Sequence, residues 1–422
     1  MSRITGYWKR KWRPAVLDAL RRRTGVPVPR GEVSAREYAG EPRDGASGRR
    51  DLVPVSLPPS EPFPDRTVSG DPALLEQTLA RITNQAARSR YLLELRGGHT
   101  SRDEEFVAVI DGARAAHTSG MVITPDDRLL LEATGLVATT DNPTNPLLLR
   151  YLPGSTRVSG CMAVVTCSMP YNYYHWLMEA LPRVALYERA GVRVDRYFAP
   201  TDARYQRETL GLLGLGRDRI ERATRNRHVV ADRLAASSWD SPAARFKTDF
   251  LHQRLTSRLD ADAPQSGRIF VSRRWRGKRM IVNDREVFAA LQPWGFRRVC
   301  LETMSVTDQI ALFHGAECVV GPHGAGLTNV VFCRPGAKVL EVNTPYRTTS
   351  LFYALARYRQ IDYHLHVADP VQDRFSNFDA AKGVGDSNMR VQPAVIAALV
   401  RDLLDGKPMP SMLRSGALRN AA

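Results

Sequence analysis

Short apolar runs alternate with helix-forming segments throughout the second half of the sequence. Five of these runs have the pattern of strands, at residues 268–273, 296–302, 318–321, 338–342 and 362–367. Helical segments separate them, and one begins at Ser305, with Asp308 three residues later in the pattern of a capping box. Strands that alternate with helices predict a parallel, doubly wound sheet, so the fold belongs to the α/β class.

Polar residues and glycines follow several of these strands. Ligands of doubly wound sheets bind outside the carboxyl ends of the strands. The residues at the predicted strand ends are Ser272, Arg273, Glu302, 322–326, Glu341 and Asn343. This group is rich in charge and glycine, and we predict the ligand site of the second half there.

A histidine, His323, stands inside the glycine-rich turn at 321–326. Glycines let the backbone turn sharply and approach a ligand closely, and the helix expected to begin near Ala325 points free N–H groups at the turn. An anion is the expected ligand. His323 can donate a hydrogen bond to a diphosphate, and Arg273 or Arg274 can supply fixed charge. The alternative is a tight turn whose glycines serve only the packing of helix on strand.

A second candidate site follows the apolar run at 161–168. His175 and Glu179 are four residues apart, so on a helix both lie on one face. Pro182 removes a helical hydrogen bond, and the helix should kink or restart near Leu181. A carboxylate can hold one ring nitrogen of a histidine while the other accepts a proton, as in a general base. A partly buried histidine without a catalytic role is the alternative.

Basic residues are concentrated at the N-terminus. The net charge is +16 over 422 residues, and the first thirty residues hold nine Lys or Arg against one acid, Asp18. Trp8, Trp12 and Leu20 can share a helical face with basic neighbours, a pattern suited to an anionic membrane surface or an acidic partner. A solvated, frayed terminus is the alternative. No zinc-finger, RNP or basic helix-turn-helix pattern occurs, so we expect no nucleic acid as a partner.

Targeting and cysteine patterns favour a cytoplasmic protein. No apolar run reaches the roughly 18 residues of a membrane span, and the N-terminus lacks the apolar stretch and small-residue cleavage site of a signal peptide. The five cysteines are odd in number and lack C-x-x-C spacing, which indicates a reducing compartment and no zinc site. A peripheral position on the inner face of a membrane follows if the basic N-terminus binds lipid.

Three motifs occur in a specific order. They are NYYHWLMEALPRV, FVSRRWRGKR, and the block from LETMSVTDQIALFHGAECVVGPHGAGLTNVVF through GAKVLEV. Together they resemble glycosyltransferase family 61, whose bacterial members are often described as capsular polysaccharide biosynthesis proteins, over roughly residues 160–345. The resemblance implies a GT-B architecture of two Rossmann-like domains facing a cleft. It also implies transfer with inversion, without a metal, from a nucleotide-sugar donor to a glycan or lipid-linked acceptor in surface or capsular polysaccharide synthesis.

The resemblance also implies roles. His175 or Glu179 is expected to take the proton from the acceptor hydroxyl while the other orients it, and positive groups hold the departing nucleoside diphosphate. Glu302 is a candidate for a hydrogen bond to the ribose or for a salt bridge. Asn329 is expected to reach the donor from the first turn of the glycine-led helix, and Glu341 to face the cleft or form an ion pair. The expected donor-binding residues are Ser272, Arg273, Glu302, His323, Gly324, Ala325, Gly326, Asn329 and Glu341.

Three parts of the chain are expected. Residues 1–70 form a basic segment and an extended lead-in, 71–255 an acceptor-side α/β domain, and 256–410 a nucleotide-sugar-binding Rossmann-like domain. Asp260 and Asp262 have the D-x-D form by which other glycosyltransferases hold a metal, but they stand in a polar turn that we assign to the linker. We expect no cofactor beyond the donor substrate. A non-catalytic glycan- or nucleotide-binding scaffold of the same fold is the alternative function.

Overall fold

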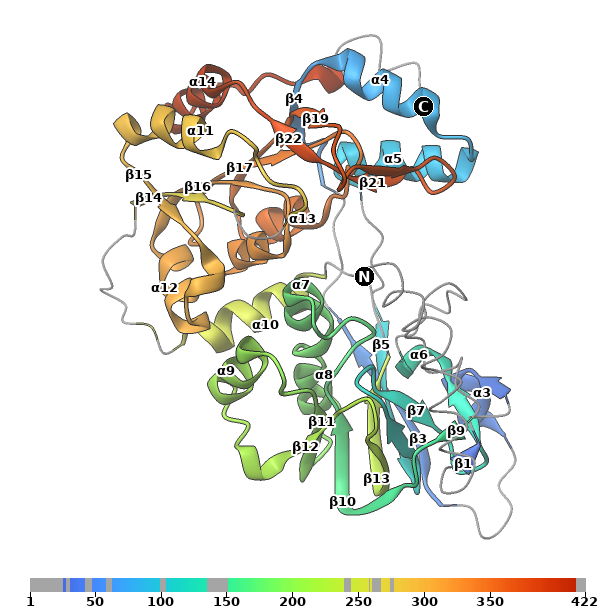
Figure 1. Cartoon of the computed structure of the whole chain (residues 1–422). Helices are drawn as coiled ribbons and strands as arrows, with labels where there is room; N and C mark the ends of the chain where they lie inside the picture. The colour runs from blue at the N-terminus through green and yellow to red at the C-terminus, as the bar shows by residue number, and fades with distance from the viewer. Residues whose placement is uncertain are drawn as a thin grey trace, which may run out of the picture. The chain divides into compact units, whose positions relative to one another are not determined.

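The structure is a computed structural model of the chain, drawn in Figure 1. The residues it describes are 26–27, 31–41, 48–57, 63–98, 104–134, 151–238, 244–257, 259, 267–273 and 277–414. The basic segment 1–25, Arg274, Asp260 and Asp262 lie outside them, so the predictions made for these residues stay predictions.

Contacts between residues divide the chain into two compact units. Unit 1 contains residues 1–59 and 102–242, and unit 2 contains residues 60–101 and 243–422. Both units combine helices with sheets that include parallel strands, which confirms the predicted α/β class. Within the described ranges, no helix is long and apolar enough to cross a membrane.

A mixed sheet of ten described strands forms the centre of unit 1. The strands are β2 (Gly31–Val33), β3 (Arg50–Ser56), β5 (Glu104–Asp111), β6 (Arg114–Ala116), β7 (Met121–Ile123), β8 (Arg128–Leu130), β10 (Thr156–Val164), β11 (Arg196–Ala199), β12 (Ile220–Arg222) and β13 (His228–Ser237). Strands β12, β11, β10 and β13 are parallel neighbours, and the antiparallel β5 and β6 both pair with β13. A separate antiparallel pair joins β1 (Val26–Pro27) to β9 (Tyr151–Leu152).

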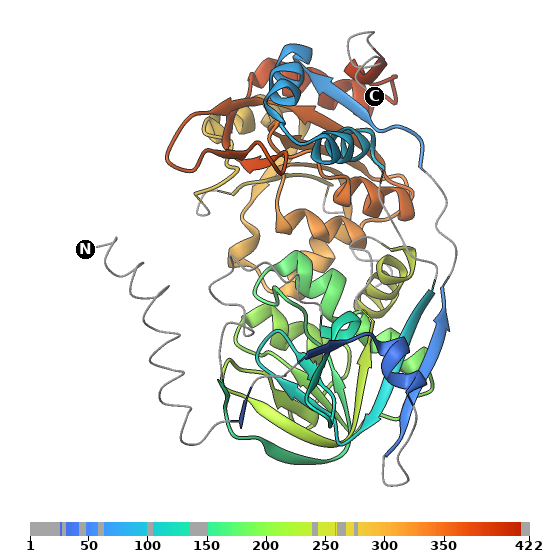
Figure 2. The ribbon, with the colours of Figure 1, turned by 90° about the vertical axis from the view of Figure 1, so that its right-hand side faces the viewer.

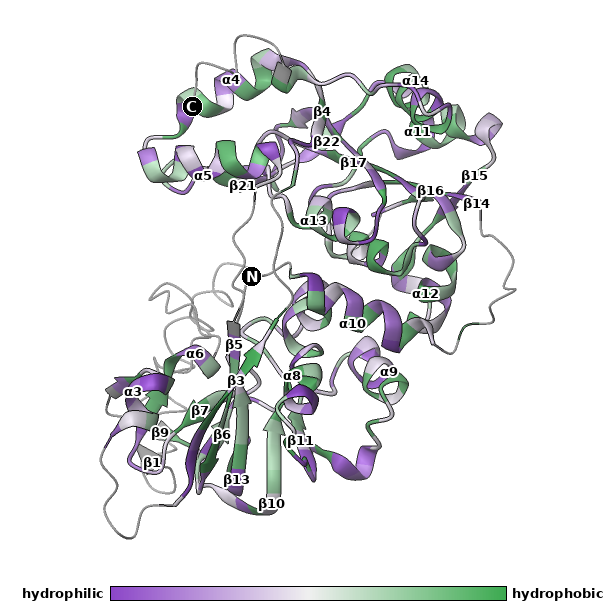
Figure 3. Cartoon of the chain, turned by 180° about the vertical axis from the view of Figure 1, so that it is seen from behind, coloured by the Kyte–Doolittle hydropathy of each residue, from purple (hydrophilic) through white to green (hydrophobic). Residues whose placement is uncertain are grey.

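The parallel part of this sheet is apolar because its strands are covered on both faces. In β10 the run Cys161–Val164 is buried throughout, and its colour in Figure 3 is hydrophobic green. Met162, Phe198 and Leu234, from three adjacent strands, belong to one buried cluster. The helical segments of unit 1 are α3 (Ala35–Gly40), α6 (Leu131–Thr134), α7 (Tyr173–His175), the π-helix η3 (Trp176–Ala180), α8 (Arg183–Arg189), α9 (Arg204–Leu212) and the 3-10 turn η4 (Arg217–Arg219).

Unit 2 contains a described sheet of six strands, all parallel, in the order β15-β14-β16-β17-β18-β4. These strands are β4 (Thr67–Gly70), β14 (Gly267–Val271), β15 (Phe296–Val299), β16 (Ala316–Pro322), β17 (Lys338–Asn343) and β18 (Asp362–Val367). Five of them are the five strands predicted from the sequence. The chain passes from β14 to β15 on one side and then through β16, β17 and β18 on the other. The winding therefore reverses between β14 and β16.

Helices cover both faces of the unit 2 sheet (Figure 1). The helical segments are α4 (Pro72–Arg81), α5 (Gln85–Arg96), α10 (Arg245–Thr256), α11 (Asp284–Leu291), η5 (Gln292–Trp294), η6 (Leu301–Thr303), α12 (Val306–His314), η7 (Ala325–Phe332), α13 (Leu351–Tyr358), α14 (Pro393–Leu404) and η8 (Met412–Arg414). Apolar residues of α11 and α14 pack with Phe270, Val320 and Leu340 of the sheet. Two small antiparallel pairs complete the unit: β19 (Asp369–Val371) with β22 (Asn388–Arg390), and β20 (Asn377–Asp379) with β21 (Val384–Asp386).

The structure corrects the predicted domain boundaries. Residues 60–101, expected to divide between the lead-in and the first domain, belong to unit 2, as does α10. Figure 2 shows the blue segment of β4, α4 and α5 among the orange and red elements of that unit. Two histidines of β18 hold β4 in place: His364 Nε2 and His366 Nδ1 lie 2.8 and 3.0 Å from the Ser69 hydroxyl. Ser69 and His366 are 297 residues apart in the sequence, so no local sequence pattern predicts their pairing.

Acid should destabilise unit 2. Burial lowers the pKa of His366 to about 4 and that of His364 to about 3, from an ordinary value of 6.5. Between pH 6.5 and 4 the unfolded chain binds protons at these residues and the folded chain does not, so stability falls as pH falls. A shift from 6.5 to about 4 corresponds to roughly 3 kcal/mol for one histidine. Thermal unfolding followed by circular dichroism should therefore shift to lower temperature across this window. The fall should be shallower in His366→Gln, and an identical pH dependence would contradict the assignment.

Candidate functional site

The reversal of winding brings two segments of unit 2 together. Ser272 and Arg273 follow β14, and His323 and Gly324 follow β16. Since β14 and β16 are adjacent strands, both segments lie at the switch point where such sheets bind ligands. A Cβ atom built on Gly324 would lie only 1.4 Å from Arg273 Nη1, so the guanidinium packs directly on the turn and glycine leaves the room for it. The buried Ser272 hydroxyl has no hydrogen-bond partner among the described residues, which leaves a polar group for a ligand to engage.

A buried carboxylate holds His323. Its Nδ1 lies 2.5 Å from Glu341 Oε1, and the Tyr363 hydroxyl donates to Glu341 Oε2 over 2.5 Å. The side chains of His323 and Glu341 are 6% and 1% exposed. Burial lowers the pKa of His323 to about 4, although Glu341 acts in the opposite direction. At neutral pH the imidazole is therefore neutral, and Nδ1 carries its proton because the carboxylate can only accept.

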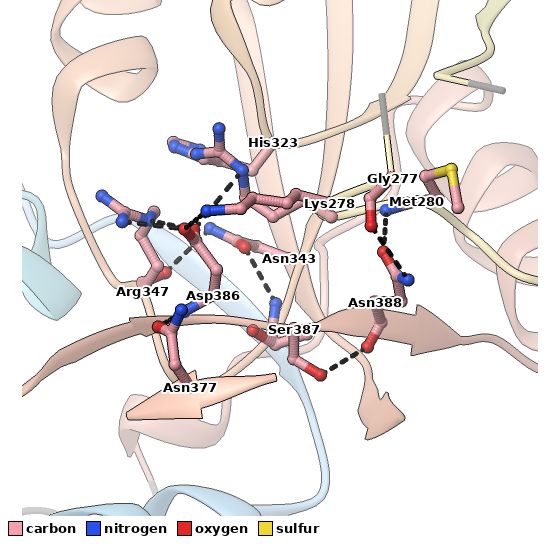
Figure 4. A network of polar contacts seen from close by, with 12 residues as sticks. Gly277, Lys278, Met280, His323, Asn343, Arg347, Asn377, Asp386, Ser387 and Asn388 are labelled. Carbon is pink, nitrogen blue, oxygen red and sulfur yellow. Dashed lines mark hydrogen bonds and ion pairs between the residues drawn. The ribbon is translucent and has the colours of Figure 1, made fainter. Parts of the chain in front are cut away.

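Three further cations lie around the carboxylate of Asp386. Figure 4 shows two of them, Lys278 and Arg347, with Asp386 and His323. Arg347 Nη2 is 3.2 Å from Asp386 Oδ1, Arg279 Nε is 3.6 Å from the same oxygen, and Lys278 Nζ is 3.7 Å from Oδ2. Burial raises the pKa of Asp386, but the three positive charges outweigh this effect and hold the pKa below its ordinary value. The charges of Arg279 and Arg347 also lower the pKa of His323, so they act on the turn itself.

The backbone fixes two of these cations. Asn343, the last residue of β17, donates its amide to the carbonyl of Arg347 over 2.8 Å. Arg279 has a φ of 55°, a left-handed conformation that is rare outside glycine and concentrated at functional sites. With Arg273, the region around the turn carries four cations against the carboxylate of Asp386 and the Glu341 carboxylate that holds His323. Such a site favours a ligand with more than one negative charge.

Sequence reasoning identified only part of this site. Lys278 and Arg279 stand in the FVSRRWRGKR motif, so their charge was visible, but they were not among the predicted donor-binding residues. Arg347 follows β17 and Asp386 ends β21, and only the folded chain brings them to the turn. A basic residue shortly after a predicted strand end was the one available signal for Arg347.

Three predicted donor residues have other surroundings. Asn329 is completely buried and donates to Gln309 Oε1 over 2.8 Å, which corrects the prediction that it reaches a donor from the first turn. Asn329 is the fifth residue of η7, beyond its first turn, and its side chain is buried against α12 rather than at the turn. Glu302 lies on η6 with an exposed side chain that accepts a weak hydrogen bond from Cys300 Sγ. Glu341 is the buried partner of His323. Ala325 and Gly326 begin η7, where a helix start was predicted.

Unit 1 holds the second candidate site, at a change of helix type. His175 ends α7, Glu179 lies in the π-helix η3, and α8 restarts after Pro182, as the sequence predicted. His175 Nδ1 is 2.6 Å from Glu179 Oε1. Short π-helices of this kind occur frequently at functional sites. Buried Arg183 fixes the restart, because its guanidinium donates to the carbonyls of Glu179 and Ser237 over 3.1 and 3.0 Å.

The pair in unit 1 has the geometry of a base and the residue that orients it. Glu179 is buried, with 2% of its side chain exposed, while the His175 side chain is 21% exposed. The carboxylate therefore holds Nδ1, which leaves Nε2 as the ring nitrogen that could accept a proton. Burial, with Glu179 adding to it, raises the pKa of the neighbouring Tyr174 well above its ordinary value, so this hydroxyl stays protonated beside the pair.

Part of the chain matches a known protein family. Residues 173–340 match the family described as Glycosyltransferase 61. This stretch carries a glycosyltransferase 61 domain. It includes His175 and Glu179 in unit 1 and the turn with His323 in unit 2. The family resemblance predicted from the motifs is therefore confirmed.

Short parts of the chain are also similar to named transferases. Identity is 29% over 90 residues with a beta-1,2-xylosyltransferase of Oryza sativa subsp. japonica, and 29% over 103 residues with a beta-1,2-xylosyltransferase of Arabidopsis thaliana. It is 30% over 97 residues with an EGF domain-specific O-linked N-acetylglucosamine transferase of Drosophila melanogaster. These matches cover 19%, 21% and 22% of this chain and 17%, 19% and 18% of the three relatives. The chain therefore matches less than a fifth of each relative.

Removal of the guanidinium from the turn should weaken the binding of a nucleoside diphosphate. Arg273→Ala deletes the group, and Gly324→Ala displaces it by steric overlap. Both variants should lose about 1.5–3 kcal/mol of binding free energy, the range for hydrogen bonds to charged groups, in calorimetric titration with UDP, GDP and ADP. Arg268→Ala, at the other end of β14 and paired with Glu317, is the matched control. Unchanged affinity in both site variants would remove Arg273 from the site.

Proposed function

We propose that this chain is an inverting glycosyltransferase that moves a sugar from a nucleotide-sugar donor to a glycan or lipid-linked acceptor in surface or capsular polysaccharide synthesis. One observation carries the proposal: the glycosyltransferase 61 domain includes the turn at the switch point of unit 2, where Arg273 packs on Gly324 and the charges of Arg279 and Arg347 act on His323. A departing nucleoside diphosphate gains negative charge in the transition state, and fixed cations stabilise that charge. We further propose a GT-B arrangement of the two units.

In the proposed reaction each unit supplies one function. Arg273, Arg279 and Arg347 of unit 2 hold the two phosphates of the donor and of the departing nucleotide. His175 of unit 1, oriented by Glu179, takes the proton of the acceptor hydroxyl as the oxygen attacks the anomeric carbon from the side opposite the nucleotide. The configuration at that carbon inverts because the attack is a single displacement. The rich supply of protein cations fits a donor site that needs no divalent metal.

A panel of nucleotide sugars tests the proposal. The panel should include activated xylose and N-acetylglucosamine, the sugars in the names of the relatives, and each donor is tested for binding and for hydrolysis or transfer. Parallel reactions with EDTA decide whether a metal is needed, and nuclear magnetic resonance of the product shows the anomeric configuration. A donor that binds but is never turned over, with any acceptor tested, would favour the non-catalytic scaffold instead.

Replacement of the His175 pair should reduce turnover without loss of donor binding. A general base contributes about 10² to 10⁴ in rate, so His175→Ala should lower kcat by that factor, and Glu179→Gln by the same or less if Glu179 only orients. The matched control is Glu208→Gln, which breaks an exposed ion pair of the same i,i+4 spacing with Arg204 on α9. If both site variants lose thermal stability and donor affinity together, the pair is structural. Wild-type turnover in both would remove it from the mechanism.

The basic N-terminal segment is proposed to bind an anionic membrane surface, where lipid-linked acceptors are made. Each Lys or Arg close to such a surface is worth about 1 kcal/mol, and the chain carries nine in its first thirty residues, eight of them within residues 1–25. Full-length protein should therefore float with vesicles that contain phosphatidylglycerol, and removal of residues 1–25 should release it while donor binding is unchanged. Failure of the full-length protein to float at moderate salt would refute this proposal.

A further inference from the structure

His323 presents a chemical problem to an anionic ligand. Its Nδ1 proton is donated to Glu341, so a neutral imidazole can offer a ligand only the lone pair of Nε2. The oxygens of a fully ionised diphosphate also carry only lone pairs. Two acceptors that face each other repel, whereas a proton between them forms a charge-assisted hydrogen bond. A diphosphate at this turn therefore calls for the protonated form of His323.

The surroundings of Glu341 favour the protonated form of His323. Glu341 lies on the central strand β17, is completely buried, and accepts hydrogen bonds from both His323 and Tyr363. Burial, with Glu341 adding to it, raises the pKa of Tyr363 well above its ordinary value, so the phenol remains a donor at every pH used for assays. The ring of Phe352 on α13 lies 5.0 Å from the ring of His323 and closes one side of the pair. Glu341 is therefore held between two side-chain partners, His323 and Tyr363, inside the protein.

The other charged groups around His323 oppose its protonation in the empty site. Burial has the largest effect on its pKa, and the positive charges of Arg279 and Arg347 add to that effect. A diphosphate changes this balance, because its charges neutralise the same arginines and attract a proton at Nε2. The charged and titratable groups near His323 are Glu341 on β17, Tyr363 on β18, Arg273 beside Gly324, and Lys278, Arg279, Arg347 and Asp386.

We propose that binding of a nucleoside diphosphate is coupled to the uptake of one proton by His323 at Nε2, with Glu341 and Tyr363 as the residues that position and tune it. This inference rests on the proposed function, because it takes the diphosphate as the ligand. In the nucleotide complex His323 is an imidazolium between two anions, the buried carboxylate and a phosphate. The proton comes from solvent on binding and returns to solvent when the nucleotide leaves.

In this proposal the buried carboxylate of Glu341 has a role beyond packing, because it holds His323. A lysine at this position would remain charged in the empty site, next to the arginines, and would repel them permanently. A histidine held by Glu341 is uncharged until the ligand arrives, so the empty turn avoids one more positive charge. Affinity for the nucleotide is then expected to fall as pH rises above neutrality, since protonation of His323 becomes less favourable.

Calorimetry in buffers of different ionisation enthalpy measures the coupled proton directly. UDP, GDP and ADP are titrated into the full-length protein, and the one that binds most tightly is used at pH 7.5, where the phosphate, with a second pKa of about 6, is already ionised. The wild type should take up between half a proton and one proton per site. His323→Gln, which keeps a side-chain N–H donor but cannot titrate, should take up none and should bind with weak pH dependence.

Two more variants test the roles of the supporting residues. Glu341→Gln removes the negative charge, so it should reduce proton uptake and shift the decline of affinity with pH to lower pH. Tyr363→Phe removes one donor from the carboxylate, which makes the carboxylate a better partner for imidazolium, so the decline should shift to higher pH. A residue with only a structural role would change affinity at all pH values alike. Opposite shifts in the two variants support the proposal. If one variant folds poorly, the comparison of proton uptake between the wild type and His323→Gln still tests it.

The outcomes separate this inference from the proposed function. If no nucleoside diphosphate binds to the wild type, both are wrong. If a nucleotide binds and the wild type takes up no more protons than His323→Gln, the donor site stands and the coupling at His323 is refuted. Uptake that persists in His323→Gln would assign the proton to another group, such as Asp386, and would also overturn the proposal.

Discussion

In unit 2 the chain leaves β14 toward one edge of the sheet and later returns to build the strands on its other side, and this reversal determines what the neighbouring loops can do. Connections that diverge from adjacent strands leave the carboxyl ends of β14 and β16 uncovered by their own helices. The segments after the two strands, with Arg273 and His323, therefore meet each other. Gly324 completes the contact, because any side chain there would occupy the volume of the guanidinium. The position of the candidate anion site thus follows from the topology of the sheet, and the residues at the two strand ends supply its charge.

Unit 2 also contains buried charged side chains, and each needs hydrogen-bond partners inside the protein. Two of them, Arg66 and Glu341, find different kinds of partner. Arg66, which is 2% exposed, donates to three backbone carbonyls, those of Leu95, Thr348 and Thr349. That arrangement joins the segment before β4 to the body of unit 2 without a carboxylate. Glu341 is different, because one of its two side-chain partners, His323, can change its protonation, while the other, Tyr363, stays a donor. A buried charged group that is hydrogen-bonded only to backbone carbonyls, like Arg66, stabilises the fold. A buried carboxylate that is bonded to a histidine at the glycine-rich turn, like Glu341, can also affect how that histidine responds to a ligand.

Local chemistry explains which features the sequence could predict. The five consecutive strands of unit 2 and the cap in which Ser305 accepts from the Asp308 amide depend on residues close in sequence, and all were predicted. The restart after Pro182 follows from a missing N–H group and was predicted for the same reason. The pairing of β4 with β18 and the ion pair of Asp386 with Arg347 are contacts between segments that are distant in sequence. The periodicity of apolar residues along the sequence does not predict such contacts. The glycine-led helix lies between these cases, since its position was predicted but not its 3-10 geometry.

The chain contains two histidine–carboxylate pairs of nearly equal length, 2.6 Å for His175 with Glu179 and 2.5 Å for His323 with Glu341. Pair geometry alone cannot assign their roles, so the surroundings must. The His175 side chain is 21% exposed and lies where the helix changes type, as the proposed contact with an acceptor hydroxyl requires. The His323 side chain is 6% exposed and lies among arginines, where a proton is unfavourable until an anion neutralises them. The same two residue types thus fit the two roles proposed above, a general base in unit 1 and a contact to an anionic ligand in unit 2.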